Sequence, residues 1–180
     1  ATIIEADIRN EQRLADAVAA ADIVFHQAAR VSVQWSVENP VKSHAVNLDP
    51  LVTILEAGRG TDTRVVFASS AAIYGNPEYV PIDESHPKAP ISPYGVEKLT
   101  GDQYCRLYHD CYDVEAVALR YFNVYGPRQA GGDYAAVISI FRDQAMDGEP
   151  ITIEGDGTQT RDFVHVDDVV QANLRAATAP

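Results

Sequence analysis

The stretch RVVFASS, residues 64–70, has the composition of a β-strand that is buried on both faces. Valines and a phenylalanine follow one another without the polar alternation of a half-exposed strand, and two serines end the run. Strands of this kind belong to parallel sheets that helices cover on both sides. The stretch therefore predicts an α/β fold in which Ser69 and Ser70 lie at the carboxyl end of an inner strand.

Segments with strand and helix patterns alternate on both sides of this stretch. Further strands are expected at TIIEAD (2–7), DIVFHQAA (22–29) and VEAVALRYF (114–122). Helices are expected at residues 10–20, 40–57 and 93–111, and a proline-rich loop at residues 76–90. Pro50 should kink or break the second helix, and Ser92 can cap the third, which has Pro93 at its first position. The alternation predicts a parallel sheet between two layers of helices.

The composition limits the class of protein. With 180 residues and 46% hydrophobic content, the chain can form one domain, or one domain with a small annex. A net charge of -12 disfavours binding to nucleic acid or to an anionic membrane surface. No apolar run reaches the ~18 residues of a membrane span and no signal peptide is visible, so we expect a cytoplasmic protein. Cys105 and Cys111 lack metal-ligand spacing and are expected to be reduced thiols, and we expect no metal site.

The spacing of Tyr94 and Lys98 indicates a chemical role. Residues four apart share one helix face, so the lysine ammonium can lie near the tyrosine phenol or near a ligand between them. A nearby positive charge lowers the pKa of a phenol, which could then act as a base. Taken alone, the pattern is more often an ordinary helix aromatic and a surface lysine. Ser70, at a strand end where ligands of parallel sheets bind, favours the chemical reading and completes a proton-transfer site.

Six segments, in order and distributed nearly from end to end of the chain, carry a family resemblance. They are EADIRN (5–10), FHQAA (25–29), FASSAAIYG (67–75), SPYGVEK (92–98), RYFNVYGPRQ (120–129) and GDGTQTRDFVHVDD (155–168). With these segments the chain resembles the extended short-chain dehydrogenase/reductase family of NAD-dependent epimerases and dehydratases, and within it the nucleotide-sugar 4-epimerases of the UDP-glucose 4-epimerase type.

This resemblance implies a Rossmann-like α/β fold with NAD as cofactor. Residues 1–126 would form part of the NAD-binding domain, residues 127–165 part of a small substrate-binding region, and residues 166–180 would return to the first domain. The cofactor-binding positions that the resemblance implies are Asp7, Ile8, Ala28, Ala29, Asn47, Ser69, Tyr94, Lys98, Tyr121 and Pro127. Asp7 and Ile8 would contact adenine, and Asn47 would brace the loop that contains the two alanines. For Ala28, Ala29 and Tyr121, plain core packing stays the alternative.

The resemblance also implies a reaction at carbon 4 of a UDP-hexose. Ser70, Tyr94 and Lys98 match the catalytic residues, and Ser70, Asn123 and Arg161 match residues that hold the substrate. Tyr94 would take the proton of the 4-hydroxyl while hydride passes to NAD, and the 4-keto sugar would turn over before hydride returns. Lys98 would hold the cofactor's ribose and, with help from the cationic nicotinamide, lower the pKa of Tyr94.

Ala71 and Ala72 indicate which reaction of the family applies. At these positions the dehydratases and the decarboxylating relatives carry an extra acid, whereas an alanine cannot transfer a proton, so elimination of water would lack its general acid. Epimerisation needs no such acid. UDP-glucuronate or an N-acetylated sugar such as UDP-N-acetylglucosamine stays open as the substrate of an epimerase or reductase.

The chain begins at the segment that matches the third strand of the family's sheet. The glycine-rich loop that receives the cofactor pyrophosphate is absent from it, as is the acidic residue expected about 20 residues later. We therefore expect an internal piece of an epimerase that does not bind NAD normally by itself, and a catalytically silent fragment is the alternative function. The intact enzyme is expected to be a homodimer formed by the helices at residues 40–57 and 93–111.

Overall fold

The centre of the molecule is a three-stranded parallel sheet. The computed structural model describes residues 1–129, 137–153 and 155–179. The strands are β1 (Ile23–His26), β2 (Arg64–Ser70) and β3 (Ala116–Tyr121), with β2 in the middle. β2 has the predicted bounds, and its residues 65–69 are all buried. The two-sided burial expected of RVVFASS is therefore confirmed.

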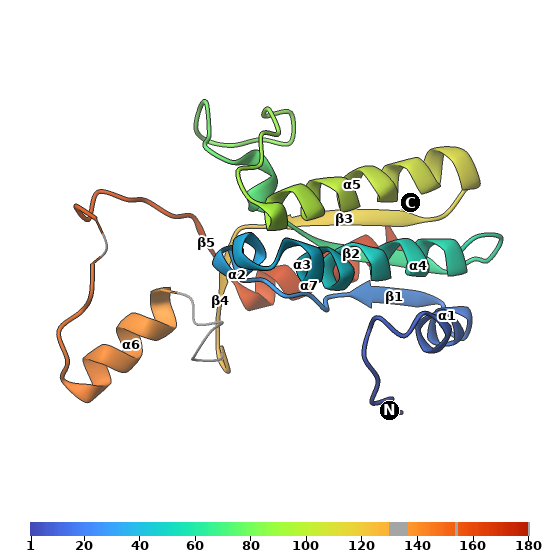
Figure 1. The fold of residues 1–180 in the computed structure, drawn as a ribbon, viewed down its shortest axis with the longest axis horizontal. Helices are drawn as coiled ribbons and strands as arrows, with labels where there is room; N and C mark the ends of the chain where they lie inside the picture. The colour runs from blue at the N-terminus through green and yellow to red at the C-terminus, as the bar shows by residue number, and fades with distance from the viewer. Residues whose placement is uncertain (130–136, 154, 180) are drawn as a thin grey trace.

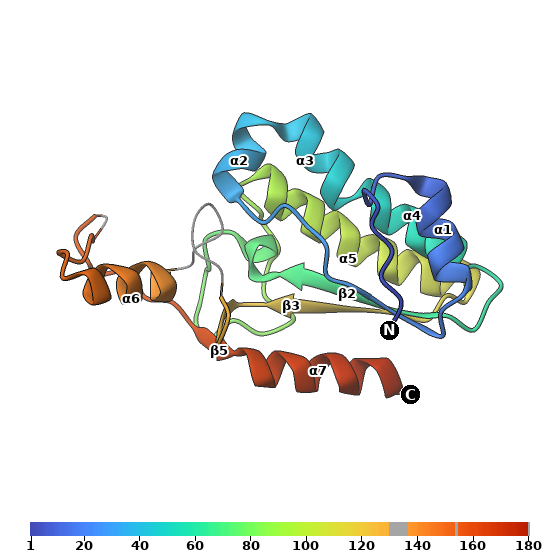
Figure 2. The same ribbon diagram turned by 90° about the horizontal axis from the view of Figure 1, so that it is seen from below.

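Helices cover both faces of this sheet, as Figure 2 shows. One face carries α1 (Glu11–Ala19), α2 (Val33–Glu38), α3 (Pro40–Asn47), α4 (Asp49–Ala57) and α5 (Pro93–Tyr112), and the other carries α7 (Val166–Thr178). Phe67 and Leu51 lie in the core on the first side, whereas Val66 packs with Ala176 and Ala177 on the second. Because successive side chains of β2 point to opposite faces, the strand joins two apolar layers, and the predicted α/β fold is confirmed.

The helix expected at residues 40–57 is two helices. α3 ends at Asn47 and α4 begins at Asp49, with Pro50 in the first turn of α4. Proline is tolerated there because the N–H groups of a first turn have no partner within the helix. The short helix α2 was not predicted; Ser32 caps it by accepting a hydrogen bond of 3.2 Å from the backbone N–H of Trp35.

The strand predicted at residues 2–7 is absent, and this prediction was wrong. The segment has no regular secondary structure, and Ile3 and Ile4 are 91% and 57% exposed. In the described part of the chain no other strand pairs with it, and β1 is the edge of the sheet. A strand pattern forms a strand only where another strand accepts and donates its backbone hydrogen bonds.

A second, smaller sheet lies beyond the carboxyl ends of these strands. β4 (Asn123–Tyr125) pairs in parallel with β5 (Phe163–His165). Figure 1 shows α6 (Val137–Asp147) standing to one side of the main body. Because β4 directly follows β3 and β5 directly precedes α7, this region is connected to the main sheet at both ends. The domain boundaries at residues 126 and 165 stay a prediction.

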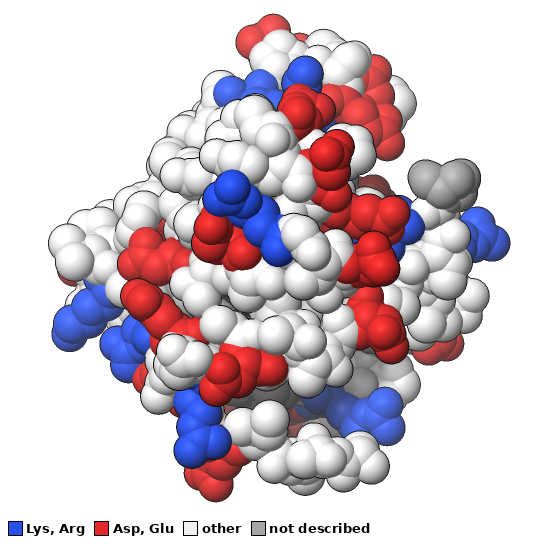
Figure 3. All heavy atoms as spheres, turned by 90° about the vertical axis from the view of Figure 1, so that its right-hand side faces the viewer, with Lys and Arg blue, Asp and Glu red and all other residues white. Residues whose placement is uncertain are grey.

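The face of the molecule drawn in Figure 3 is mainly acidic. On the face drawn in Figure 3, aspartate and glutamate side chains are spread among fewer basic ones, in keeping with the net charge of -12. Across the described residues no helix is both long and apolar enough to cross a membrane.

Candidate active site

The predicted catalytic residues meet where the carboxyl end of β2 faces the start of α5. Ser92 caps α5 by accepting a hydrogen bond of 3.1 Å from the N–H of Gly95. Tyr94 and Lys98 then lie on the inner face of the helix, 8% and 3% exposed. The i, i+4 spacing therefore places both side chains against the sheet, and not on the surface.

Two glycines let α5 approach the sheet closely. A Cβ atom on Gly101 would lie 2.6 Å from the ring of Phe67 on β2, and one on Gly95 would lie 2.7 Å from the carbonyl oxygen of Ala72. At both distances a larger side chain would force the neighbouring atoms to shift. The close approach brings Lys98 within reach of the β2 backbone.

Lys98 is a buried ammonium. Its Nζ donates a hydrogen bond of 2.8 Å to the carbonyl oxygen of Ala68 and lies 4.7 Å from the centre of the Phe67 ring. Burial lowers the pKa of Lys98 to about 8, against the opposing attraction of Glu97 and Asp102. Lys98 can thus stay protonated at neutral pH. Of its three N–H donors, one is used by the Ala68 carbonyl.

The phenol of Tyr94 is a weaker acid than a solvent-exposed tyrosine. Burial raises the pKa of Tyr94, a hydrogen bond from the Ser70 side chain opposes that rise, and the negative charge of Glu97 adds to it. The Lys98 ammonium, 5.7 Å from the centre of the Tyr94 ring, does not lower this pKa below its ordinary value. Without the cofactor, loss of hydration therefore outweighs the nearby charge, and the predicted lowering of this pKa by Lys98 together with the nicotinamide cation stays a prediction.

The two serines at the end of β2 have different surroundings. Ser70 is the residue beside Tyr94, and its hydroxyl also accepts a hydrogen bond of 3.2 Å from the N–H of Ala72 at the start of the short helix η1 (Ala71–Tyr74). Ser69 is buried, and its hydroxyl oxygen has no hydrogen-bond partner within the described residues. The catalytic assignment of Ser70 agrees with this geometry, and the assignment of Ser69 to the cofactor stays a prediction.

Asn47 holds the loop that follows β1. Its Oδ1 accepts a hydrogen bond of 2.7 Å from the N–H of Arg30, and its Nδ2 donates one of 3.1 Å to the carbonyl oxygen of Arg30. Ala28 and Ala29, just before this bracket, line a hollow together with Trp35 and with basic side chains that include Arg30. Asn47 is thus bonded to the loop that contains the two alanines, and its part in cofactor binding stays a prediction.

Asp7 and Ile8 lie in the irregular segment before α1. The carboxylate of Asp7 forms an exposed ion pair of 2.6 Å with Arg9. Hydrogen bonds from the side chain and the backbone of Arg9 hold the pKa of Asp7 well below its usual range. Because the segment is not a strand in this structure, the expected strand end that would present Asp7 to adenine is not formed.

Tyr121 points its hydroxyl towards α7. The oxygen accepts hydrogen bonds from Asn173 Nδ2 at 2.6 Å and from Gln27 Nε2 at 3.2 Å, and Gln27 also donates to Asn173 Oδ1. This polar cluster connects the ends of β1 and β3 to a helix about fifty residues later. Sequence reasoning missed Gln27 and Asn173, because no spacing in the chain relates them. Pro127 is exposed in the turn after β4.

Asn123 and Arg161 are not brought to Tyr94. Asn123 Nδ2 donates a hydrogen bond of 2.8 Å to the carbonyl oxygen of Asp162, which aligns β4 with β5. Arg161 donates to the carbonyl oxygen of Thr160 and lines a hollow beside α6. The two residues are neighbours of one small sheet, beyond the strand ends that carry the proton-transfer residues.

His26 is a second buried group that sequence reasoning missed. It is 4% exposed at the end of β1, stacks on Phe67 and has no hydrogen-bond partner for Nε2 in the described part of the chain. Burial, and then the positive charge of Lys98, lower the pKa of His26 to about 4. The ring is therefore neutral at pH 7.

Comparison with known proteins gives one consistent result. Residues 1–180 match the family model described as the NAD dependent epimerase/dehydratase family. A putative UDP-glucose 4-epimerase of Methanocaldococcus jannaschii is 47% identical over 180 residues, which are 98% of this chain and 59% of that protein. The chain thus spans a little over half the length of this relative.

Two solved structures have the same fold. A UDP-N-acetylglucosamine 4-epimerase from Methanobrevibacter ruminantium, in complex with UDP-N-acetylmuramic acid, matches with a TM-score of 0.92 and 39% identity over 98% of this chain and 57% of that one. A UDP-glucose 4-epimerase from Thermotoga maritima with UDP-glucose matches with a TM-score of 0.92 and 37% identity over 98% and 59%.

Proposed function

This chain belongs to the NAD-dependent epimerase/dehydratase family, and from that premise we propose that the protein inverts carbon 4 of a UDP-hexose of the UDP-glucose and UDP-galactose type. The observation that carries the proposal is the contact of Ser70 with the buried phenol of Tyr94, one helical turn from the buried Lys98. These groups can move one proton to and from a sugar hydroxyl. The relatives named above, two of them UDP-glucose 4-epimerases, support this reaction.

The residues present fit NAD as the cofactor. Lys98 is a buried cation beside the phenol, and the small side chains of Ala28 and Ala29 leave open space at the end of β1. Lys98 would donate to the ribose hydroxyls, and the loop held by Asn47 would face the rest of the cofactor. When bound, NAD would supply the reversible hydride exchange at carbon 4 that inversion requires.

The protein's own residues would perform the proton transfer. Ser70 donates a hydrogen bond that stabilises the Tyr94 phenolate, and Tyr94 takes the proton from the 4-hydroxyl of the sugar and later gives it back. Because burial raises the pKa of Tyr94, ionisation at neutral pH requires positive charge beyond that of the protein, and the nicotinamide cation is a suitable source. We thus expect Tyr94 to become a base only when NAD is bound.

Elimination of water is disfavoured as the reaction. Ala71 and Ala72 form the first half of η1, next to Ser70, and neither carries a proton donor. Asn123 and Arg161 would hold the substrate's diphosphate, since a guanidinium group suits phosphate oxygens. A substrate other than UDP-glucose, such as UDP-glucuronate or UDP-N-acetylglucosamine, is the second candidate, and the 39% identical UDP-N-acetylglucosamine 4-epimerase favours keeping it.

A direct assay tests the proposal. Full-length protein with NAD and UDP-glucose should form UDP-galactose, detected by chromatography of the nucleotide sugars, and each of the other two UDP-sugars is tested in parallel. Turnover of only an N-acetylated or uronate sugar would replace UDP-glucose by that substrate. No turnover of any of them by folded, NAD-loaded protein would support the catalytically silent alternative.

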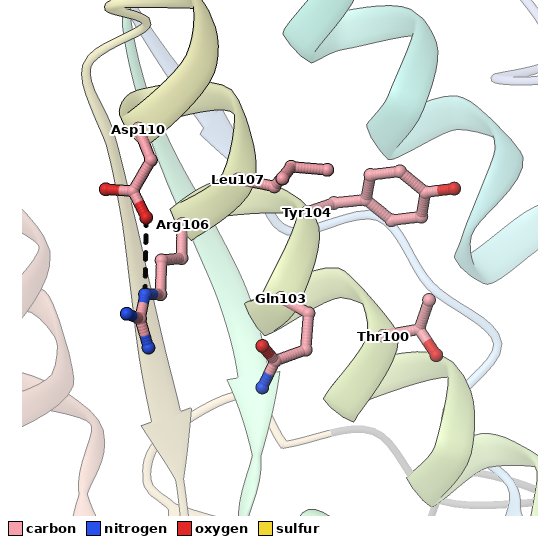
Figure 4. Close-up of a pocket in the computed structure, with 6 residues that line it drawn as sticks. All are labelled: Thr100, Gln103, Tyr104, Arg106, Leu107 and Asp110. Carbon is pink, nitrogen blue, oxygen red and sulfur yellow. Dashed lines mark hydrogen bonds and ion pairs between the residues drawn. The ribbon is translucent and has the colours of Figure 1, made fainter.

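We also propose a cytoplasmic homodimer, in which α5 carries the interface. Figure 4 shows side chains of Tyr104, Leu107 and their neighbours lining a hollow on the outer side of α5. Leu107 is 48% exposed, whereas Leu51, Ile54 and Leu55 of α4 are fully buried within one chain and are not available to a partner. The free thiols Cys105 and Cys111 suit a reducing compartment such as the cytoplasm.

Replacing Leu107 by glutamate should convert the dimer to a monomer. A charge placed in an apolar contact loses its hydration without gaining a partner, so association should weaken at least about 100-fold. Light scattering at micromolar concentration measures the mass, and Met146→Glu, at an 81% exposed position of α6, is the control. A wild-type protein that is already monomeric, or a Leu107→Glu variant that is still dimeric, would contradict this interface.

A further inference from the structure

Glu97 is a buried carboxylate next in sequence to Lys98. It is 4% exposed between α3 and α5, and its Oε2 accepts hydrogen bonds of 2.8 Å from Ser43 Oγ and 2.8 Å from Asn47 Nδ2. These two donors are neutral side chains of α3. Burying a carboxylate against neutral donors costs more free energy than burying an apolar residue of the same size, so stability alone does not account for an acid at this position.

The carboxylate also determines the orientation of the Asn47 amide. A carboxylate only accepts hydrogen bonds, so Asn47 must turn its NH₂ group towards Glu97 and its oxygen away from it. That oxygen is the atom that accepts the 2.7 Å hydrogen bond from the N–H of Arg30. Glu97 is therefore connected through one side chain to the loop that contains Ala28 and Ala29.

The negative charge of Glu97 reaches the proton-transfer residues as well. It favours the protonated form of Lys98 and disfavours ionisation of Tyr94. Tyr94 itself is fixed by α2, since its backbone N–H donates a hydrogen bond of 3.2 Å to Ser36 Oγ. Glu97 thus affects both the position of the loop that contains Ala28 and Ala29 and the ionisation of Lys98 and Tyr94.

We propose that Glu97 is a positioning residue that ties the loop of residues 28–30, through Asn47 and Ser43, to the helix that carries Tyr94 and Lys98. This connection holds the loop of residues 28–30 in a fixed position relative to Tyr94 and Lys98. Its meaning for catalysis rests on the proposed function, whereas the connection between Glu97 and the loop is a property of the fold.

Two substitutions in the full-length protein separate the effect of the Glu97 hydrogen bond on the loop from the effect of its negative charge on Tyr94. Glu97→Gln keeps an oxygen that can accept from Asn47 but removes the charge, so the Kd for NAD should stay within about twofold, while the rise of kcat with pH should move about 0.5 unit to lower pH. Glu97→Ala removes both, so exchange of the Arg30 amide hydrogen should become about 10-fold faster and the Kd for NAD about 10-fold weaker. Glu38→Gln, an exposed acid on α2, should change none of these quantities.

The outcomes keep this inference apart from the proposed function. Unchanged Arg30 exchange in Glu97→Ala, or an active Glu97→Gln with an unshifted pH profile, would overturn the inference and leave the epimerase proposal standing. If the wild-type protein turns over no nucleotide sugar, the proposed function fails, and Arg30 exchange in Glu97→Ala still decides the inference. If Glu97→Ala does not fold, the pH profile of Glu97→Gln decides it.

Discussion

Replacing Tyr94 by phenylalanine in the full-length protein should lower kcat about 1,000-fold, the scale of a lost general base. The substitution removes the oxygen that meets Ser70 and leaves the ring between α5 and the sheet. Because phenylalanine retains the packing, the Kd for NAD should stay within about twofold. Steady-state epimerisation and calorimetric titration of NAD measure the two quantities.

Tyr112→Phe is the matched control. It removes a phenol hydroxyl from the same helix α5, at a 41% exposed position where the ring lies over Arg59, and should leave kcat unchanged. If Tyr94→Phe kept more than about a tenth of wild-type kcat, the base would have to be another group, and the assignment of Tyr94 would be abandoned.

Lys98→Met should abolish most activity and at the same time stabilise the protein. Loss of the ammonium removes the proposed donor to the cofactor ribose, so we expect kcat/KM to fall at least about 100-fold. The stability change follows from the pKa of Lys98, which is about 8 in the folded protein against 10.5 for a free lysine. At pH 7 the lysine is charged in both states, and burying its charge costs on the order of 3 kcal/mol.

The stability gained by Lys98→Met should depend on pH. Since the folded-state pKa lies below the unfolded one, the penalty is complete below pH 8 and fades as pH rises to about 10.5. Lys98→Met removes the penalty but leaves the Ala68 carbonyl without its donor, which costs about 1 kcal/mol. The free energy of unfolding at pH 7 should therefore rise by about 1–2 kcal/mol.

Chemical denaturation at pH 7 and pH 10 measures both effects. The advantage of Lys98→Met over wild type should be smaller at pH 10 than at pH 7. Lys88→Met, in the loop before α5, should alter neither activity nor stability by a comparable amount. A Lys98→Met variant less stable than wild type at pH 7 would show that the hydrogen bond and the contact with Phe67 outweigh the burial of the charge.

Local patterns in the sequence were sufficient to predict the strand and the helix that position the site. The apolar run of residues 64–70 identified the inner strand with its bounds, and Ser92 with Pro93 identified the start of α5. The spacing of Tyr94 and Lys98 placed both on one helix face. Each of these features depends on residues within a few positions of one another, which is why a single sequence reveals them. Residues 2–7 show the limit, because their strand pattern lacks a partner strand in the described chain.

The sequence by itself determined which groups are near one another on α5 and which strand end they face. Only the tertiary structure decided their chemistry. Burial raises the pKa of Tyr94, an effect that the spacing of Tyr94 and Lys98 does not reveal, and Glu97 meets Asn47 across 50 positions of the chain. The physical reason is that helix and strand patterns arise from neighbouring residues, whereas the loss of hydration and the partners of a buried charge depend on what the rest of the chain packs around it.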